Sequence, residues 1–193
     1  MSQKRLVRVV TISMMGAVAF LMMYFEFPLP TFPVFLKIDF SEIPALVVGL
    51  IFGPWAGVGV EGMKNLIHYM VKGSETGIPI GQLANFAAGG LFVYLVSVLY
   101  QKGRNMRGLI LGLAVATIAM SALMSISNYY ILFPAYAYFL HFPLQEEELL
   151  KTVLFGIAPF NLIKGFILSV LTVLLYSKLG DFIREKKAIF STR

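Results

Sequence analysis

The stretch PFNLIKG at residues 159–165 puts an amide and an ammonium in the middle of the last and longest apolar run, residues 152–176. At about 1.5 Å per residue, that run is long enough to cross a hydrocarbon layer of roughly 30 Å as a helix. Lys164 lies roughly 18 Å from the start of the run, too deep for its side chain to reach the near surface. Asn161 precedes it by three residues and shares its helical face. The sequence therefore predicts a membrane helix with a polar patch at membrane depth.

A lysine at such a depth needs a polar environment, because burying it at the centre of a membrane helix costs at least about 2.5 to 3.5 kcal/mol. Such residues normally face a water-filled cavity or an ionic partner. We expect the counter-charge of Lys164 to come from Asp39 or Glu42, in the segment where the second predicted helix begins. That pairing would tie the loop over the polar patch as a lid.

The composition excludes a soluble globular domain, since 58% of the 193 residues are hydrophobic and 13% are charged. We predict an all-α integral membrane protein, with six transmembrane helices in a single domain. The predicted spans are residues 6–25, 41–53, 54–71, 80–100, 108–130 and 152–178. The connections between them are too short for a soluble catalytic domain. The chain has no cysteine, which excludes disulfides, thiolate nucleophiles and cysteine-based metal sites.

The net charge of +6 is distributed as a topology signal rather than as a surface for nucleic acid. Basic residues flank the apolar runs in three groups: Lys4, Arg5 and Arg8; Lys102, Arg104 and Arg107; and Lys178, Arg184, Lys186, Lys187 and Arg193. Because cytoplasmic loops of membrane proteins are rich in Lys and Arg, we place both termini in the cytoplasm, which requires an even number of spans. The proline-rich loop after residue 26 and the loops at residues 73–80 and 138–151 then face outside.

Several polar side chains fall in the outer half of this arrangement or at mid-depth: Asp39, Glu42, Gln82, Asn85, Asn128, Asn161 and Lys164. An amide offers two donors and two acceptors, so three asparagines favour a ligand whose edge alternates carbonyl and N–H groups, or one with several hydroxyls. Aromatic and methionine side chains nearby favour a flat, partly apolar body. The pattern predicts a cavity that opens outward and fits a heterocyclic vitamin.

A second polar group lies on one face of the third predicted span, where Glu61, Lys64, Asn65 and His68 follow one another at helical spacings. An ion pair between Glu61 and Lys64 is one interpretation, and direct contact with a ligand is the other. The overlapping sequence GVGVEG at residues 57–62 matches a dinucleotide-binding pattern, but it lies inside an apolar helical run without a preceding strand. We therefore assign its glycines to close helix packing.

An intramembrane enzyme is the rival class of function, and it would use Glu61, His68 or the triple glutamate at residues 146–148. The motifs G-x-S-x-G and H-E-x-x-H are absent from the sequence. The triple glutamate fits either a cation site or a favourable interaction with a helix N-terminus. The ATP-binding motif G-x-x-x-x-G-K-[ST] is also absent, so any energy source must be another protein. We therefore predict a solute-binding transporter subunit and no enzyme.

Two further segments predict contacts with lipid or with protein. Residues 129–144 are rich in aromatic side chains, which we assign to an aromatic belt at the membrane interface. Ser13 and Ala17 form a pair of small residues one helical turn apart in the first span, with Gly16 and Ala19 beside them. Such a surface lets another membrane helix approach closely, either within this protein or from a partner.

Five segments in series carry a resemblance to a known family. They are LKIDFSEIPA (36–45), FGPWAG (52–57) with VEGMKN (60–65), PIGQLANF (79–86), SISNY (125–129) with FPAY (133–136), and PFNLIKG (159–165). Together they resemble the riboflavin-binding S component of bacterial energy-coupling factor (ECF) transporters, over nearly the whole chain. The resemblance implies a six-helix protein of the bacterial plasma membrane that binds riboflavin from outside. It also implies a membrane coupling subunit (T component) and two cytoplasmic ATPases as partners.

Carried over by motif, the ligand-binding positions of that family correspond to Leu36, Lys37, Asp39, Glu42, Gly81, Asn85, Asn128, Asn161 and Lys164. The family's first helix carries an Ala-x-x-x-Ala surface for the coupling subunit, which corresponds here to Ser13 and Ala17. Serine departs from that pattern but is still small. Riboflavin is thus the expected ligand, with no cofactor, metal, catalytic residue or nucleic acid.

Overall fold

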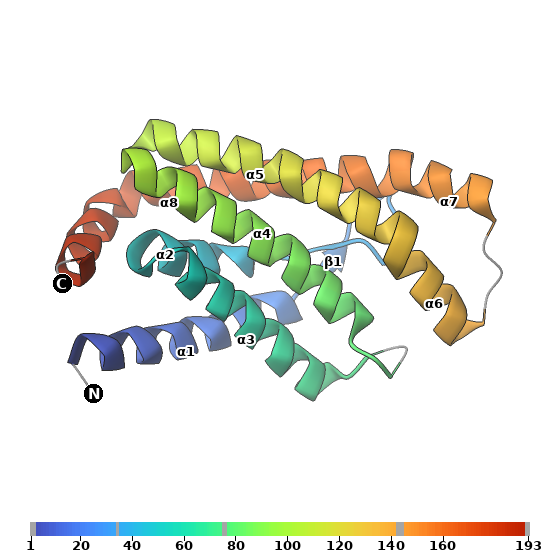
Figure 1. Cartoon of the computed structure of the whole chain (residues 1–193), viewed down its shortest axis with the longest axis horizontal. Coiled ribbons are helices and arrows are strands. Elements are labelled where there is room, and N and C mark those ends of the chain that lie inside the picture. The colour runs from blue at the N-terminus through green and yellow to red at the C-terminus, as the bar shows by residue number, and fades with distance from the viewer. Residues whose placement is uncertain (1–2, 34, 75–76, 142–144, 192–193) are drawn as a thin grey trace.

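The computed structural model describes residues 3–33, 35–74, 77–141 and 145–191, which form a bundle of helices (Figure 1). Its helices are α1 (Gln3–Tyr24), α2 (Glu42–Phe52), α3 (Pro54–Lys72), α4 (Ile80–Gly103), α5 (Met106–Ser127), α6 (Phe133–Leu140), α7 (Glu146–Thr152) and α8 (Ala158–Ser191). Two π-helical turns, η1 (Asn128–Leu132) and η2 (Val153–Ile157), join α5 to α6 and α7 to α8. Two short strands, β1 (Phe27–Pro28) and β2 (Lys37–Ile38), pair antiparallel in the loop before α2.

Helical structure extends beyond the last two predicted spans, residues 108–130 and 152–178. The segment α5–η1–α6 runs to Leu140, and the segment α7–η2–α8 begins at Glu146, so the loop predicted at residues 138–151 is wrong at both ends. Pro134 does not stop the first segment; it stands in the first turn of α6, directly after the π-helical turn η1. The glutamates at residues 146–148 occupy the first turn of α7, where negative charge is favourable. Residues 142–144 lie outside the described residues.

Apolar helices of membrane length dominate the chain. Within the described ranges, four segments are long and apolar enough to cross a membrane: Gln3–Tyr24, Ile80–Gly103, Met106–Leu140 and Glu146–Phe190. By contrast, α2 has 11 residues and reaches only about 16 Å. Helix α3 carries Glu61 and Lys64 fully buried inside the bundle. The chain is therefore a membrane protein in which α2 and α3 depend on neighbouring helices for their polar contacts.

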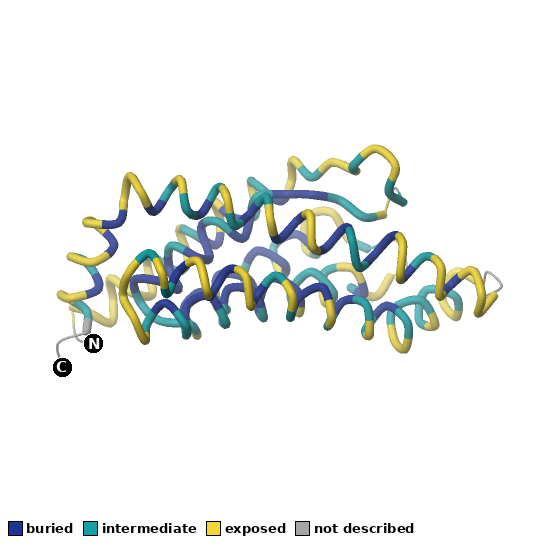
Figure 2. Tube along the Cα trace, turned by 90° about the horizontal axis from the view of Figure 1, so that it is seen from above, coloured by how far each residue is buried: buried dark blue, intermediate teal, exposed yellow. Residues whose placement is uncertain are grey.

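The helices pack so that α3 contacts α1, α2 and α4, while α5 contacts α4 and α8 (Figure 1). Buried and exposed residues alternate along most of them (Figure 2). A Cβ atom on Gly57 would lie 2.8 Å from the carbonyl oxygen of Ala45, so α3 can approach α2 only through this glycine. The assignment to close helix packing is therefore confirmed for Gly57, whereas Gly59 and Gly62 have room for a Cβ atom at 3.7 and 3.6 Å from their nearest neighbours.

The two ends of the bundle differ in what they carry. Both termini lie at one end, together with the α2–α3 and α4–α5 turns (Figure 1). Gly53 makes the first of these turns with a φ of 105°, and Pro54 starts α3. The β1–β2 loop and the α3–α4 and α6–α7 connections lie toward the other end. Loops and helix starts at that end enclose the cavity described next.

Candidate functional site

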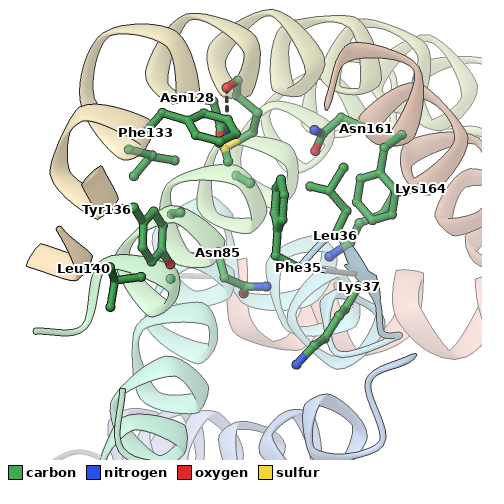
Figure 3. Close-up of a pocket in the computed structure, with 16 residues that line it drawn as sticks. Phe35, Leu36, Lys37, Asn85, Asn128, Phe133, Tyr136, Leu140, Asn161 and Lys164 are labelled. Atoms are coloured by element: carbon green, nitrogen blue, oxygen red, sulfur yellow. Dashed lines mark hydrogen bonds between the residues drawn. The ribbon is translucent and has the colours of Figure 1, made fainter. Parts of the chain in front are cut away.

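A cavity of about 340 Å³ opens between α4, the α5–η1–α6 segment, α8 and the loop before α2 (Figure 3). Seven of the nine predicted ligand-binding residues line it: Leu36, Lys37, Gly81, Asn85, Asn128, Asn161 and Lys164. The volume is at the lower end of the range for small-molecule sites. We name it the amide cavity, after Asn85, Asn128 and Asn161. These three side chains come from α4, η1 and α8 and surround one space (Figure 3).

The asparagines keep hydrogen-bonding capacity for a guest. The Nδ2 atom of Asn128 donates to the Met124 carbonyl at 2.7 Å, and that of Asn161 donates to the Ile157 carbonyl at 2.8 Å. Each bond stays within the residue's own helical segment, and no described residue donates to the Oδ1 atom of either side chain. The Oδ1 atom of Asn85 is buried without a hydrogen-bond partner among the described residues. Buried amide oxygens of this kind are unusual unless a ligand or water completes them.

The π-helical turns stand next to two of these asparagines. Asn128 is the first residue of η1, and Asn161 follows η2 by one turn of α8. The two π-helical turns also contact each other across the bundle. A π-helical turn inserts one residue into a helix and so re-aims the side chains beside it, which is why such turns are frequent at functional sites. The helical periodicity of the sequence alone does not reveal them.

Lys164 is held by two buried carboxylates. Its Nζ atom lies 2.9 Å from Glu42 Oε1 and 3.2 Å from Asp39 Oδ2, which confirms the predicted counter-charges. All three side chains are at most 7% exposed. Because an ammonium has three N–H donors, one remains after these two contacts, and Lys164 lines the cavity. The pairs also attach the loop before α2 to α8, as the lid interpretation expects.

A second buried group, the α3 cluster of Glu61, Lys64 and Asn65, lies beside these carboxylates. Lys64 Nζ is 2.8 Å from Glu61 Oε2 and 3.7 Å from Glu42 Oε1, and it donates to the Ser41 hydroxyl. The predicted ion pair between Glu61 and Lys64 is therefore confirmed. None of the three residues lines the amide cavity.

Aromatic and apolar side chains form the rest of the cavity wall, and the sequence reasoning did not assign them there. Phe133, Tyr136 and Leu140 of α6 line the cavity together with Phe35 (Figure 3), and Phe160 also lines it. Their spacing of three and four residues along α6 is a helical signal that could have identified a common face. The aromatic-belt interpretation fits Tyr130 and Tyr138 of the same region, which are 71% and 74% exposed.

A second cavity, of about 370 Å³, adjoins the first and shares Phe35, Lys37, Gly81, Asn85 and Tyr136 with it. Asp39 and His68 line this space. At its edge the Oε1 atom of Glu26 lies 2.9 Å from the Nζ atoms of both Lys37 and Lys72. Burial raises the pKa of Glu26, but the hydrogen bonds and charges of the two lysines outweigh burial and lower it below its ordinary value. One carboxylate thus joins β2 to the end of α3.

The remaining predicted residues do not line the amide cavity. Glu42 lines neither cavity and acts through Lys164 and Lys64. Ser13 and Ala17 are exposed on α1. In the triple glutamate, Glu147 is paired with Lys151 at 2.9 Å on the exposed surface of α7. Gln82, from the same outer group, donates to the Gly73 carbonyl at 2.8 Å.

Comparison with known proteins agrees with the resemblance seen in the five segments. A family model described as "ECF transporter, substrate-specific component" matches residues 7–176. The riboflavin transporter FmnP of Bacillus subtilis (strain 168) is 44% identical over 182 residues, which cover 94% of this chain and 96% of the relative. The riboflavin transporter RibU of Staphylococcus aureus (strain TCH60) is 39% identical over 178 residues, which cover 92% and 93%.

A solved structure, described as the S component of a bacterial ECF transporter, is similar to this chain throughout. The TM-score is 0.78 at 37% sequence identity, and the match covers 93% of this chain and 98% of that one. The fold is therefore shared along with the sequence.

Proposed function

Because the chain belongs to the family of ECF transporter substrate-specific components, we propose that it binds riboflavin for uptake across the bacterial plasma membrane. The observation that carries this proposal is the amide cavity, where asparagines with unused acceptors meet an aromatic wall. Similarity to two riboflavin transporters over 94% and 92% of the chain selects riboflavin among the vitamins. The family is a transporter component, and the chain is not an enzyme.

The chemistry of riboflavin matches the groups in the amide cavity. Its ring system is flat and largely apolar, while one edge alternates carbonyl and N–H groups. Phe133 and Tyr136 can pack against the rings, and the amides of Asn128 and Asn161 can bond the polar edge. The remaining N–H of Lys164 can donate to a ring carbonyl. Leu36, Lys37, Gly81 and Asn85 complete the proposed site, and Asp39 and Glu42 support it by holding Lys164.

The proposed topology has six crossings, with both termini in the cytoplasm. Its support is that the two termini lie at the same end of the bundle (Figure 1) and that five basic residues line one space between the start of α1, the α4–α5 turn and the end of α8. The amide cavity then opens toward the outside, so the protein captures its ligand there. A membrane coupling subunit and two ATPases supply the energy. The coupling subunit contacts the exposed surface around Ser13 and Ala17 of α1.

A titration of the purified protein tests this function. Protein in a mild detergent is mixed with riboflavin, flavin mononucleotide or thiamin, and binding is followed through quenching of flavin fluorescence or by calorimetry. We expect saturable binding of one riboflavin per chain and no binding of thiamin. A protein that is purified without colour and does not bind added riboflavin would contradict the proposal.

A further inference from the structure

A basic cavity of about 330 Å³ lies at the end of the bundle where both termini are found (Figure 1). Five cationic residues line it: Lys4, Arg5, Arg8, Arg104 and Lys187. They come from the start of α1, the α4–α5 turn and the end of α8. None of the ten lining residues is acidic. A topology signal requires basic residues only somewhere on this side of the membrane, so it does not explain why they converge on one space.

Lys187 is the residue that points to a ligand. Its side chain is 8% exposed, and its Nζ atom has no hydrogen-bond partner among the described residues. The ammonium lies 5.0 Å from the centre of the Tyr100 ring, which is a favourable cation–π contact. The ring does not replace a conventional hydrogen-bond acceptor for the three N–H groups of the ammonium. By contrast, Lys164 of the amide cavity is buried to a similar degree and contacts two carboxylates, those of Asp39 and Glu42. A buried ammonium without an acceptor is costly unless an anion completes it.

We propose that the basic cavity binds the phosphate group of an anionic phospholipid from the adjacent leaflet. A phosphate offers several acceptor oxygens, which matches a site made of Arg and Lys donors. Basic pockets between membrane helices on the cytoplasmic side are suited to lipid headgroups. The apolar residues Ile51, Phe52 and Phe190 also line the cavity and can contact the glycerol and the first acyl carbons. Val9 and Val10 of α1 are exposed beside it, so a lipid chain can continue along that helix.

Lipid-dependent stabilisation tests this proposal independently of riboflavin. The purified protein in a neutral detergent is heated with added phosphatidylglycerol or phosphatidylcholine, and unfolding is recorded. The variants are Lys187→Gln and its matched control Lys186→Gln, the neighbouring lysine that lies over the Phe182 ring and outside the cavity. We expect phosphatidylglycerol alone to raise the Tm of the wild type and of Lys186→Gln by several degrees. Lys187→Gln should lose at least half of that shift, and Lys187→Arg should retain it.

Native mass spectrometry gives a second measurement, in which phosphatidylglycerol should be retained about ten-fold less by Lys187→Gln than by Lys186→Gln. If Lys187→Gln does not fold, Arg104→Gln replaces it, with Arg107→Gln as the control outside the cavity. Equal responses of the matched variants, or equal effects of the two lipids, would overturn the proposal. A full Tm shift with inorganic phosphate alone would assign the site to a soluble anion. An unchanged lipid response combined with lost assembly with other subunits would assign it to an acidic protein partner.

Discussion

The α3 cluster and the amide cavity contain the same kinds of buried group, but the residues of the α3 cluster do not line the amide cavity. Lys64 and Lys164 each contact Glu42 and one further carboxylate. Asn65 and Asn161 each donate Nδ2 to the carbonyl four residues earlier in the chain. Yet Lys164 and Asn161 line the amide cavity, and their α3 counterparts do not. Polar groups within a membrane protein therefore indicate a binding site only when open space adjoins them.

The largest expected effect comes from removing the positive charge of Lys64 in the α3 cluster. Lys64→Met leaves Glu61 and Glu42 buried with less compensation, so we expect the free energy of unfolding to fall by about 3 to 5 kcal/mol. Chemical unfolding in detergent measures the loss. In the control, Lys151→Met removes only an exposed pair with Glu147, and we expect less than about 1 kcal/mol. Equal small losses for the two variants would show that the α3 cluster is not structural.

Asn161 and Asn65 allow a matched pair of variants, one inside the amide cavity and one outside it. Asn161→Ala should weaken riboflavin binding by about 1 to 3 kcal/mol, or roughly 5- to 150-fold in Kd, because a ligand group loses its partner. Asn65→Ala removes the same amide and the same bond within a helix from a residue outside the cavity, so its Kd should stay within about two-fold of wild type. Calorimetric titration of both variants measures the difference. Equal losses would place the ligand near α3.

A surface variant should disturb neither polar region. Ala17 is exposed on α1, so Ala17→Trp should leave riboflavin binding unchanged. It should reduce the coupling subunit recovered by co-purification by about ten-fold, since a bulky group at a small-residue interface costs at least about 1 kcal/mol. Met14→Trp is the control, because Met14 is already large and 65% exposed on the same helix. Normal assembly of Ala17→Trp would contradict the proposed contact surface.

The smallest expected effect concerns the edge of the cavities, where Glu26 joins β2 to α3. Because these ion pairs are partly exposed, Glu26→Gln should speed riboflavin release only a few-fold, equivalent to less than about 1 kcal/mol. Stopped-flow fluorescence measures the rate. Glu147→Gln, which removes an exposed pair far from the cavities, should leave release unchanged.

The ion pairs of Glu26 with Lys37 and Lys72 also predict that the effect of Glu26→Gln on riboflavin release depends on pH. The pKa of Glu26 is lowered in the folded protein, because its two lysines outweigh the opposing effect of burial. The stabilisation is therefore fully present above the unfolded pKa and is lost as the pH falls through the folded pKa. The difference in release rate between wild type and Glu26→Gln should be present at neutral pH and disappear in strongly acidic buffer. A difference independent of pH would exclude the ion pairs as its cause.

The sequence predicted contacts correctly where they depend on the free-energy cost of burying a charge or on the helical spacing of two residues. Lys164 is too deep in an apolar run to remain unpaired, and Asp39 and Glu42 lie where the outer loop meets the second predicted helix, so the sequence predicted the pairing that the structure contains. The three-residue spacing of Glu61 and Lys64 likewise allowed an ion pair, one of the two interpretations of this group, and the structure contains it. The helical class followed from composition and from the length of the apolar runs.

The remaining features depend on tertiary structure that hydropathy does not encode. Phe133 and Tyr136 are aromatic whether they face lipid or a cavity, so an interfacial belt explained them equally well. The π-helical turns re-aim side chains without leaving a mark in the apolar pattern. The sequence shows that the basic residues flank apolar runs. It does not show that Arg104 and Lys187 line one cavity, because the two residues are brought together only by the packing of the helices.

The most direct test of the central claim is an experimental structure with riboflavin bound. The account predicts that the ring system lies in the amide cavity, with a polar atom of its edge within about 3.2 Å of the amide of Asn128 or Asn161. It also predicts that Lys164 still contacts Asp39 and Glu42. Riboflavin bound elsewhere on the chain, with both asparagines making no contact to it, would contradict the account.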